Sequence, residues 1–470
     1  MIFCSSLCAN YLSKAMILCS SLKKYHPECI TIICLVEEEI PREIGEFKYF
    51  DKIILAKDLG IENFYQYMFK HTIIEGATCV KGHLFQYLLD NYQDENKFIY
   101  LDPDVKVFSC LEELEALLEQ EEIVITPHLT GYRKELSYIK HHEISVLQHG
   151  VYNLGFLGIR RGEESRKFIN WWTSRLYKYC YDDKENGIFT DQKWIDLAPA
   201  LFDVYILKHP GYNFAWWNYP TREVTGDNEN YSVNDSKLRF MHFSHFDSGI
   251  NMDTAKWVYP DDKHVIYPLL GEYADELRTL NEKYKLNKKE WSYARYSNNK
   301  LITKEEREYY RQGERILKSI KNPFVSENVI CDVIDTKDYI EKLEQIRKSL
   351  NLNTEDELWK SFWLNISLLS SATSNHAKYV VWGCDKTGEI THNLINSLFP
   401  GHQIVGAVDK FKKGKFAGCE ITLPENIKDL EYDYVIICSN GAKYEAVELF
   451  ESMGQDFGNK YIYGYGVSAV

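Results

Sequence analysis

Two carboxylates one residue apart follow a short apolar run in the sequence. Residues 98–101 have the continuous hydrophobic character of a buried parallel strand, and Asp102 and Asp104 come directly after it. Ligands of open α/β sheets bind at the carboxyl ends of such strands, and Pro103 stiffens the turn that presents both side chains. Hard, anionic oxygen donors suit Mg²⁺ or Mn²⁺, which substrate phosphates commonly share. The structural alternative is a simple Asp-Pro turn that closes a strand.

Composition and charge exclude several classes of function. The 470 residues exceed what one hydrophobic core can organise, so we expect about two to four domains. The net charge of −14, with 69 acidic against 55 basic residues and no long basic run, argues against a nucleic-acid partner. The 12 cysteines are scattered without a C-x-x-C pair, which is typical of reduced thiols in a cytosol and argues against disulfides or a structural zinc.

The amino-terminal stretch is moderately apolar but does not have the pattern of an export signal. Residues 1–22 lack a basic segment at the start, and Asn10 and Lys14 interrupt the apolar part. We therefore interpret them as a first strand and helix. The sequence predicts a cytoplasmic protein, with binding at the inner face of the cell membrane, beside a lipid-linked substrate, left open.

The pattern of apolar runs predicts an α/β fold with two sheet-based parts. The first part, a Rossmann-like doubly wound sheet, has predicted strands at residues 2–4, 30–36, 53–55, 98–101, 123–126, 152–159 and 238–243. Its predicted helices lie at about 10–25, 83–90, 164–179 and 191–196. A small second β-α-β unit has predicted strands at 379–382, 404–408 and 434–438 and a helix at 387–398. We divide the chain into a sheet domain, a helical extension, a helical linker and a second α/β domain, at residues 1–268, 269–325, 326–374 and 375–470.

Several segments together resemble one family of enzymes. Their order along residues 1–325 is similar to that in nucleotide-sugar-dependent glycosyltransferases of the GT-A fold, and above all in bacterial enzymes distantly related to the retaining, glycogenin-like galactosyl- and glucosyltransferases. The segments that carry this resemblance are residues 100–105, 152–158, 190–194 and 241–246, with 291–296, 309–311 and 322–324 later in the chain.

The resemblance implies a divalent metal site. Asp102 and Asp104 correspond to the DxD pair, which holds a Mn²⁺ or Mg²⁺ ion that bridges the donor diphosphate. His242 corresponds to the later histidine ligand, and His245 is the alternative because this chain has Ser-His-Phe where many relatives have Ser-Gly-Phe. Packing in the core is the other hypothesis for a histidine beside aromatic residues.

The resemblance also implies donor and catalytic residues. Asp191 and Gln192 correspond to the pair that faces the transferred sugar, although a carboxylate in the first turn of a helix capped by Thr190 is also a good cap. Asn153 and Gly155 are assigned to donor binding, as are three residues near helix starts. These are Asn10 and Tyr11 after the first strand, at the expected base and ribose site, and Lys81, placed to meet a phosphate together with free helical N–H groups. For Tyr11 and Lys81 a solvated surface position is the alternative.

Acceptor contacts are predicted for a histidine and two tryptophans. His128 resembles a histidine that faces the acceptor in the relatives. Trp216 and Trp217 belong to an aromatic cluster that offers either sugar stacking or core packing.

The second α/β part contains a strand-to-helix turn of nucleotide-binding type. Gly383 and Gly388 stand five residues apart, and Asp409 ends the next predicted strand. The spacing is neither G-x-G-x-x-G nor a Walker A loop, so it supports specific cofactor binding only weakly. The segment resembles nucleotide-sugar or CoA-binding-like modules of bacterial sugar enzymes, and we expect a docking or regulatory role.

These observations favour a metal-dependent glycosyltransferase that uses a nucleotide sugar, expected to be a UDP-sugar, with retention. The acceptor class is a saccharide, a lipid-linked glycan or a glycoprotein in the synthesis of a bacterial surface glycan. One alternative is a non-catalytic carbohydrate or nucleotide-sugar binding protein on a transferase scaffold, against which the intact Asp102 and Asp104 argue. The other alternative, a two-domain oxidoreductase, lacks a Tyr-x-x-x-Lys pair near the second unit.

Overall fold

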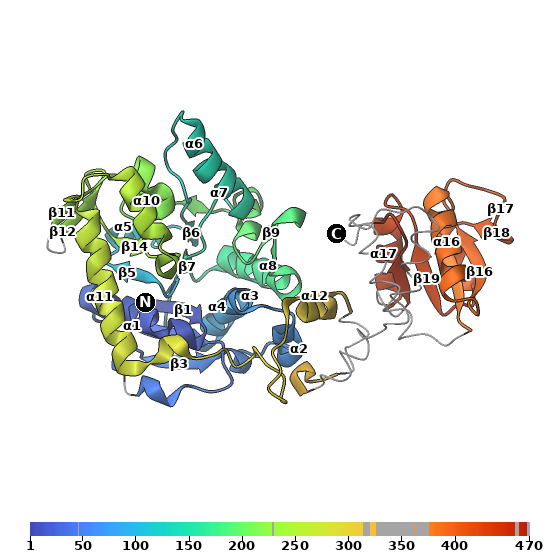
Figure 1. Cartoon of the computed structure of the whole chain (residues 1–470), viewed down its shortest axis with the longest axis horizontal. Helices are drawn as coiled ribbons and strands as arrows, with labels where there is room; N and C mark the ends of the chain where they lie inside the picture. Colours follow the sequence, from blue (N-terminus) through green and yellow to red (C-terminus); the bar gives the residue numbers. More distant parts are fainter. Residues whose placement is uncertain are drawn as a thin grey trace. The chain divides into compact units, whose positions relative to one another are not determined.

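The computed structural model divides the chain into two compact units, Met1–Ala294 and Arg295–Val470 (Figure 1). It describes residues 1–45, 47–227, 230–313, 320–325, 362, 376–455 and 460–467. The predicted linker at 326–374 lies outside the described residues, except for Phe362. The predicted α/β class, with a second, smaller sheet-based unit, is confirmed.

The first unit is built on a seven-stranded sheet of order β10-β6-β7-β4-β1-β2-β3. Strand β7 is antiparallel to its neighbours β4 and β6, and the other pairs are parallel. Its apolar strands are buried on both faces, as continuous hydrophobic runs predict. The strands are β1 (Ile2–Leu7), β2 (Ile30–Leu35), β3 (Lys52–Leu55), β4 (Lys97–Leu101), β6 (Ile123–Ile125), β7 (Phe156–Arg160) and β10 (Tyr205–Ile206).

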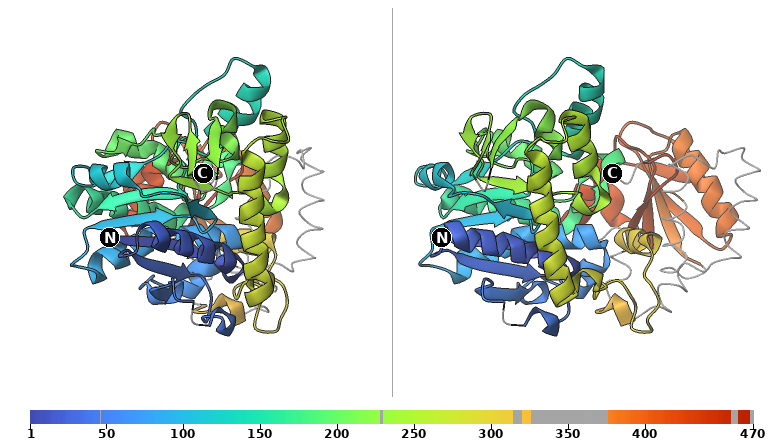
Figure 2. Two further views of the ribbon diagram at one scale, coloured as in Figure 1. Left: turned by 90° about the vertical axis from the view of Figure 1, so that its left-hand side faces the viewer. Right: turned by 60° about the vertical axis from the view of Figure 1, so that its left-hand side comes forward.

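Helices cover this sheet and extend beyond it. Helix α4 packs on α8, where the rings of Phe85 and Trp172 lie 6.5 Å apart, and α11 crosses α1 (Figure 2). The α-helices of the unit are α1 (Leu12–Tyr25), α2 (Phe64–Phe69), α3 (Ile73–Cys79), α4 (Lys81–Asn91), α5 (Glu112–Leu117), α6 (Leu136–Tyr138), α7 (Ile144–His149), α8 (Glu163–Tyr179), α9 (Ala198–Leu201), α10 (Ile250–Val258) and α11 (Ile266–Tyr284).

Short elements at the carboxyl edge of the sheet position the candidate site. Strand β5 (Val105–Val107) pairs antiparallel with β14 (Phe240–His242). Two further small sheets consist of β8 (Asp182–Asp183) with β9 (Ile188–Phe189), and of β11 (Val224–Asp227), β12 (Asn230–Val233) and β13 (Ser236–Lys237). Single-turn segments used below are η1 (Ala9–Tyr11), η4 (Ile139–Glu143), η6 (Lys193–Leu197), η7 (Trp216–Thr221), η8 (Phe246–Ser248) and η9 (Leu286–Lys288).

Three predicted boundaries in the first unit are wrong. The strand predicted from residue 152 begins at Phe156, and Tyr152 forms only an isolated bridge to Pro127. The helix predicted from His83 begins at Lys81. The helix predicted at 191–196 is the 3₁₀ segment η6, which begins at Lys193, and Thr190 has a left-handed φ of 45° instead of capping it.

The second unit contains a six-stranded sheet of order β17-β18-β16-β15-β19-β20. All pairs are parallel except β17 with β18. Its strands are β15 (Lys378–Trp382), β16 (Gln403–Val408), β17 (Lys415–Phe416), β18 (Cys419–Thr422), β19 (Tyr434–Ile437) and β20 (Tyr461–Tyr463). Its described helices are α12 (Lys304–Gly313), α16 (Lys386–Leu398) and α17 (Lys443–Ser452), with short turns η11 (Pro323–Val325) and η12 (Pro424–Asp429).

Candidate active site and metal centre

The two aspartates of the predicted pair lie in a tight turn at the end of β4. The Asp102 N–H donates to the Gly155 carbonyl oxygen at 2.9 Å, and the Val105 N–H donates to the Asp102 carbonyl oxygen at 3.1 Å. Both bonds fix the backbone around Pro103. The chain then enters β5, whose Val105 is in register with His242 of β14. This register places an imidazole beside both carboxylates.

Asp102, Asp104 and His242 form a group that could hold a metal ion. One ligand atom from each residue lies within 4.8 Å of the others. His242 Nε2 is 3.0 Å from Asp104 Oδ1 and 3.7 Å from Asp102 Oδ2. Two carboxylates and one imidazole suit Mn²⁺ or Mg²⁺, so the donor set fits the predicted ion. The alternative ligand His245 is exposed and does not belong to the group.

The electrostatics of the group keep Asp104 ionised and favour the protonated form of His242, which must lose its proton to bind a metal ion. Burial acts to raise the pKa of Asp104, but His242 and then Lys14 outweigh it and hold that pKa at about 2. Burial acts to lower the pKa of His242, and Asp104 raises it above its ordinary value. Asp104 therefore stays ionised, as a metal ligand must.

Lys81 is a buried cation that holds two carboxylates. Its Nζ lies 2.9 Å from Asp191 Oδ2 and 3.3 Å from Asp102 Oδ1, and it donates to the Leu154 carbonyl oxygen at 3.0 Å. Lys81 is 2% exposed and Asp191 is 2% exposed. This corrects the solvated alternative for Lys81. The ammonium that was expected to meet a phosphate is bound to carboxylates of the site itself.

Asp191 belongs to this ion cluster and Gln192 follows it in the chain, and neither side chain caps the segment η6. Burial raises the pKa of Asp191, against the lowering effect of Lys81. Asp191 Oδ1 accepts from the Thr190 hydroxyl at 3.1 Å. The Gln192 side chain accepts from the Leu154 N–H at 3.1 Å and donates to the His149 carbonyl oxygen at 3.0 Å. Both side chains are thus held in fixed orientations.

Asn153 is the central residue of a buried network of side-chain hydrogen bonds. Its Nδ2 lies 3.2 Å from Gln192 Oε1 and 3.1 Å from His128 Nε2, and its Oδ1 accepts from the Gly155 N–H at 3.1 Å. Asn213, which the sequence did not single out, donates to the same Oδ1 at 3.0 Å. Burial lowers the pKa of His128 to about 3, so this imidazole is neutral in the network.

Gly155 leaves space for the histidine ligand. An added Cβ would lie 2.4 Å from His242 Cε1 and 2.7 Å from Asn153 Oδ1. The absence of a side chain at this position is therefore required by the packing of the His242 ring.

The two tryptophans line the site next to its histidines. The Trp217 ring contacts the His242 ring edge-on at 5.2 Å and the His128 ring at 5.3 Å. Trp216 contacts the His245 ring at 6.3 Å. The indole N–H groups of both tryptophans are buried without a hydrogen-bond partner among the described residues. Trp217 therefore has an unused donor next to the candidate ligand His242, and Trp216 has one next to His245.

Segment η1 contains Asn10 and Tyr11, and burial, followed by the nearby Asp104 carboxylate, raises the pKa of Tyr11. Asn10 Oδ1 is buried without a partner among the described residues, and Tyr11 lies under the Lys14 ammonium at 4.1 Å. Lys14 pairs with Asp247 Oδ2 at 2.6 Å. The sequence offered one signal for Lys14, a cation that interrupts an otherwise apolar helix, but none for its partner.

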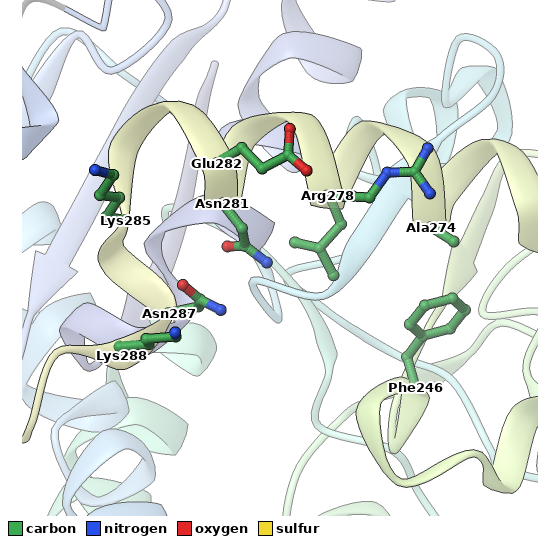
Figure 3. Close-up of a pocket in the computed structure, with 9 residues that line it drawn as sticks. Phe246, Ala274, Arg278, Asn281, Glu282, Lys285, Asn287 and Lys288 are labelled. Carbon is green, nitrogen blue, oxygen red and sulfur yellow. The ribbon is translucent and has the colours of Figure 1, made fainter.

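A groove of about 580 Å³ runs along the end of α11, with Phe246 of η8 facing it (Figure 3). It is lined by Phe246, Ala274, Leu277, Arg278, Asn281, Glu282, Lys285, Asn287 and Lys288. None of the residues predicted for the site lines it.

In the second unit, two aspartates accept hydrogen bonds from backbone N–H groups of the glycine turn. Asp385 accepts from the N–H groups of Thr387 at 3.0 Å and Gly388 at 3.2 Å. Asp409 Oδ2 accepts from the Cys384 N–H at 2.9 Å. Gly383 has a φ of +104°, which glycine tolerates best, and a Cβ on Gly388 would lie 2.2 Å from the Gly383 carbonyl oxygen. The predicted roles of Gly383, Gly388 and Asp409 in nucleotide binding stay predictions.

Comparisons with known proteins cover each part of the chain. Residues 375–456 match the family model described as C2185-like, N-terminal. Two curated relatives come from Bacillus subtilis (strain 168). The uncharacterized protein YfnF is 26% identical over 256 residues, which is 52% of this chain and 80% of YfnF. The uncharacterized protein YfnD is 24% identical over 178 residues, which is 37% of this chain and 55% of YfnD.

Three solved structures are similar to this chain. The galactosyltransferase LgtC in complex with donor and acceptor sugar analogs has 16% identity and a TM-score of 0.37, covering 61% of this chain and 100% of LgtC. The glycosyltransferase GlyE of Streptococcus pneumoniae TIGR4 has 13% identity and a TM-score of 0.31, covering 98% of this chain and 94% of GlyE. Mouse xyloside xylosyltransferase 1 has 18% identity and a TM-score of 0.29, covering 46% and 88%.

Proposed function

We propose that the first unit is a metal-dependent glycosyltransferase that moves a sugar from a nucleotide-sugar donor, a UDP-sugar, to a saccharide acceptor in bacterial surface glycan or glycoconjugate synthesis. The observation that carries the proposal is the convergence of Asp102, Asp104 and His242 within 4.8 Å, next to the Lys81 and Asp191 ion pair. Sequence segments far apart in the chain build this group at the carboxyl edge of the sheet.

Asp102, Asp104 and His242 would hold the Mn²⁺ or Mg²⁺ ion, which when bound stabilises negative charge on the leaving diphosphate. Lys14 adds a second positive charge near Asp104. Asn10 and Tyr11 in η1 would bind the base and ribose. In this proposal the metal ligands and Lys14 recognise the charge of the diphosphate, and Asn10 and Tyr11 recognise the nucleoside.

Asp191 and Gln192 would orient the transferred sugar. Lys81 holds Asp191 at 2.9 Å, so this carboxylate has a fixed orientation in which it can accept hydrogen bonds from sugar hydroxyls. The resemblance to retaining enzymes supports a proposal of retention, with an α-linked product from an α-linked donor. NMR of the anomeric proton of the product tests it, and a β-linkage would contradict it.

His128, Trp216 and Trp217 would form the acceptor side. The Trp217 ring lies against the metal-ligand histidine, so a sugar that packs on this indole would be near the reaction centre. The buried indole N–H groups could donate to its hydroxyls.

The test is Asp104→Asn, which keeps the shape of the side chain and removes one charge. Release of UDP from UDP-sugars and binding of Mn²⁺ by calorimetry are measured on the full chain. We expect at least about a hundredfold loss of turnover and weaker Mn²⁺ binding, the scale of several kcal/mol that such a charge supplies. The matched control is Asp262→Asn, a change of the same chemistry at an exposed position.

Two outcomes would contradict the proposal. Unchanged Mn²⁺ binding and turnover in Asp104→Asn would remove the metal assignment. Binding of a UDP-sugar by the wild-type chain with no turnover against any saccharide, and no hydrolysis, would favour the non-catalytic binding protein.

A further inference from the structure

An exposed helical segment of the first unit carries a row of large apolar side chains. It runs from Tyr132 through α6, η4 and α7, and both views show it projecting from the rest of the unit (Figures 1 and 2). Tyr132 is 79% exposed and Leu136 is 83% exposed, while Ile144 and Leu147 are 45% and 64% exposed. We call these four residues the apolar face.

Three of these residues share one stretch of helix. Leu136, Ile144 and Leu147 lie in one continuous helical segment that includes the π-helical turn η4, and all three side chains face solvent. Tyr138 and His142 of the same segment are buried, at 1% and 4% exposure. The segment is therefore amphipathic, with its apolar side turned to solvent.

The buried side fixes the segment on the first unit. His142 Nδ1 is 3.0 Å from the Trp217 carbonyl oxygen, and the His142 ring stacks on Tyr138 at 4.9 Å. The Tyr138 hydroxyl donates to the Gly131 carbonyl oxygen at 3.1 Å. Because the helix is anchored in this way, its apolar side chains are presented to a partner and do not fold back.

Unpaired cations accompany the apolar face. Arg133, Lys134 and Lys140 are exposed, and none of them forms an ion pair within the described part of the chain. Two acidic residues, Glu135 and Glu143, lie in the same segment, so cations outnumber anions here although the whole chain carries −14. An exposed apolar face in a segment that also carries unpaired cations is the pattern of a helix that lies in the interface of an anionic lipid surface.

We propose that the apolar face inserts into the headgroup region of a membrane that contains anionic phospholipid. None of the helices that the structure describes has the length and apolar character needed to cross a bilayer, so the contact is peripheral. The inference does not depend on the proposed function. If that function holds, the anchor at Trp217 places the lipid surface next to the acceptor side, which suits a lipid-linked saccharide.

The experiment is cosedimentation of the full chain with phosphatidylcholine vesicles, with and without phosphatidylglycerol. We expect binding to the anionic vesicles, loss of binding at high salt, and at least about tenfold weaker binding by the double variant Leu136→Glu with Leu147→Glu. The control Leu201→Glu changes a side chain that is 54% exposed on α9 and should bind as the wild type does.

Three results would overturn the proposal. They are no vesicle binding by the wild type, equal binding by the wild type and the double variant, and a wild-type dimer in light scattering that the double variant converts to a monomer. The last result would assign the apolar face to a second copy of the chain. Mn²⁺ binding by the double variant, measured in the same preparation, verifies that the first unit is folded and keeps this test separate from the test of catalysis.

Discussion

Lys81 neutralises charge that the site could not otherwise tolerate. Asp102 and Asp191 both lie within 3.3 Å of its ammonium, and Asp191 is almost wholly buried. Removing one partner from such a cluster costs about 3–5 kcal/mol, because it leaves an uncompensated buried charge. The cation therefore explains how a third carboxylate, Asp191, can lie beside Asp102 and Asp104.

Gly155 provides the sharpest prediction at the scale of one residue. In Gly155→Ala the added Cβ would lie 2.4 Å from the His242 ring, so the ring or the strand must move. We expect a loss of about 1–3 kcal/mol in the free energy of unfolding, and weaker Mn²⁺ binding because the ligand is displaced. Urea denaturation and calorimetry measure the two effects.

The matched control for this change is Gly271→Ala in α11. A Cβ there meets no atom within 4 Å, so alanine should stabilise the helix by up to about 1 kcal/mol and leave Mn²⁺ binding unchanged. If Gly155→Ala behaved like the control, the packing role of Gly155 would be wrong.

At the scale of one element, Asp385 determines how α16 begins. Its carboxylate accepts from the N–H groups of Thr387 and Gly388 and from the Thr387 hydroxyl at 2.7 Å. We expect Asp385→Ala to destabilise α16 by about 1–2 kcal/mol, and Asp385→Asn to retain most of the stability since asparagine also caps helices. Hydrogen–deuterium exchange at residues 386–398 reports the change. If residues 386–398 of Asp385→Ala were protected as well as those of Asp385→Asn and of the wild type, the cap would contribute little.

Strands and helices with a clear pattern of apolar residues of their own could be predicted from the sequence. The buried strands β1, β2 and β4 and the helices α1 and α8 were placed to within a few residues, because apolar periodicity reflects burial directly. The turn at 190–192 could not be predicted, because Thr190 adopts a left-handed φ and Gln192 is held by contacts with residues far away in sequence. The antiparallel direction of β7 is likewise a property of the assembled sheet.

The same distinction applies to the candidate site. Asp102 and Asp104 are visible as a local pattern at a strand end, and the resemblance added His242. The partners that complete the site are distant: Lys14 pairs with a residue 233 positions later, and Asn213 reaches Asn153 across 60 positions. No local pattern signals such pairs, so the sequence predicted the candidate ligands and missed these distant contacts.

At the scale of the whole molecule, the two compact units predict that residues 1–294 fold without the rest of the chain. They contain the seven-stranded sheet and every residue of the metal group. We expect the truncated protein to unfold in one cooperative transition and to bind Mn²⁺ as the full chain does, within about twofold. Circular dichroism with heating and calorimetry test this. A soluble, folded truncation that binds no Mn²⁺ would mean that the site needs the second unit.

The pairing of β5 with β14 has a consequence for how the protein is made. Asp104 lies on a turn that leaves the ribosome long before His242, and the two meet only when β14 pairs with β5. Closing so long a loop is slow, although its entropic cost grows only slowly with length. A nascent chain that ends before β14 therefore has its carboxylates but not its imidazole, and cannot form the metal group. Metal capture should accordingly be one of the last events in the maturation of the first unit.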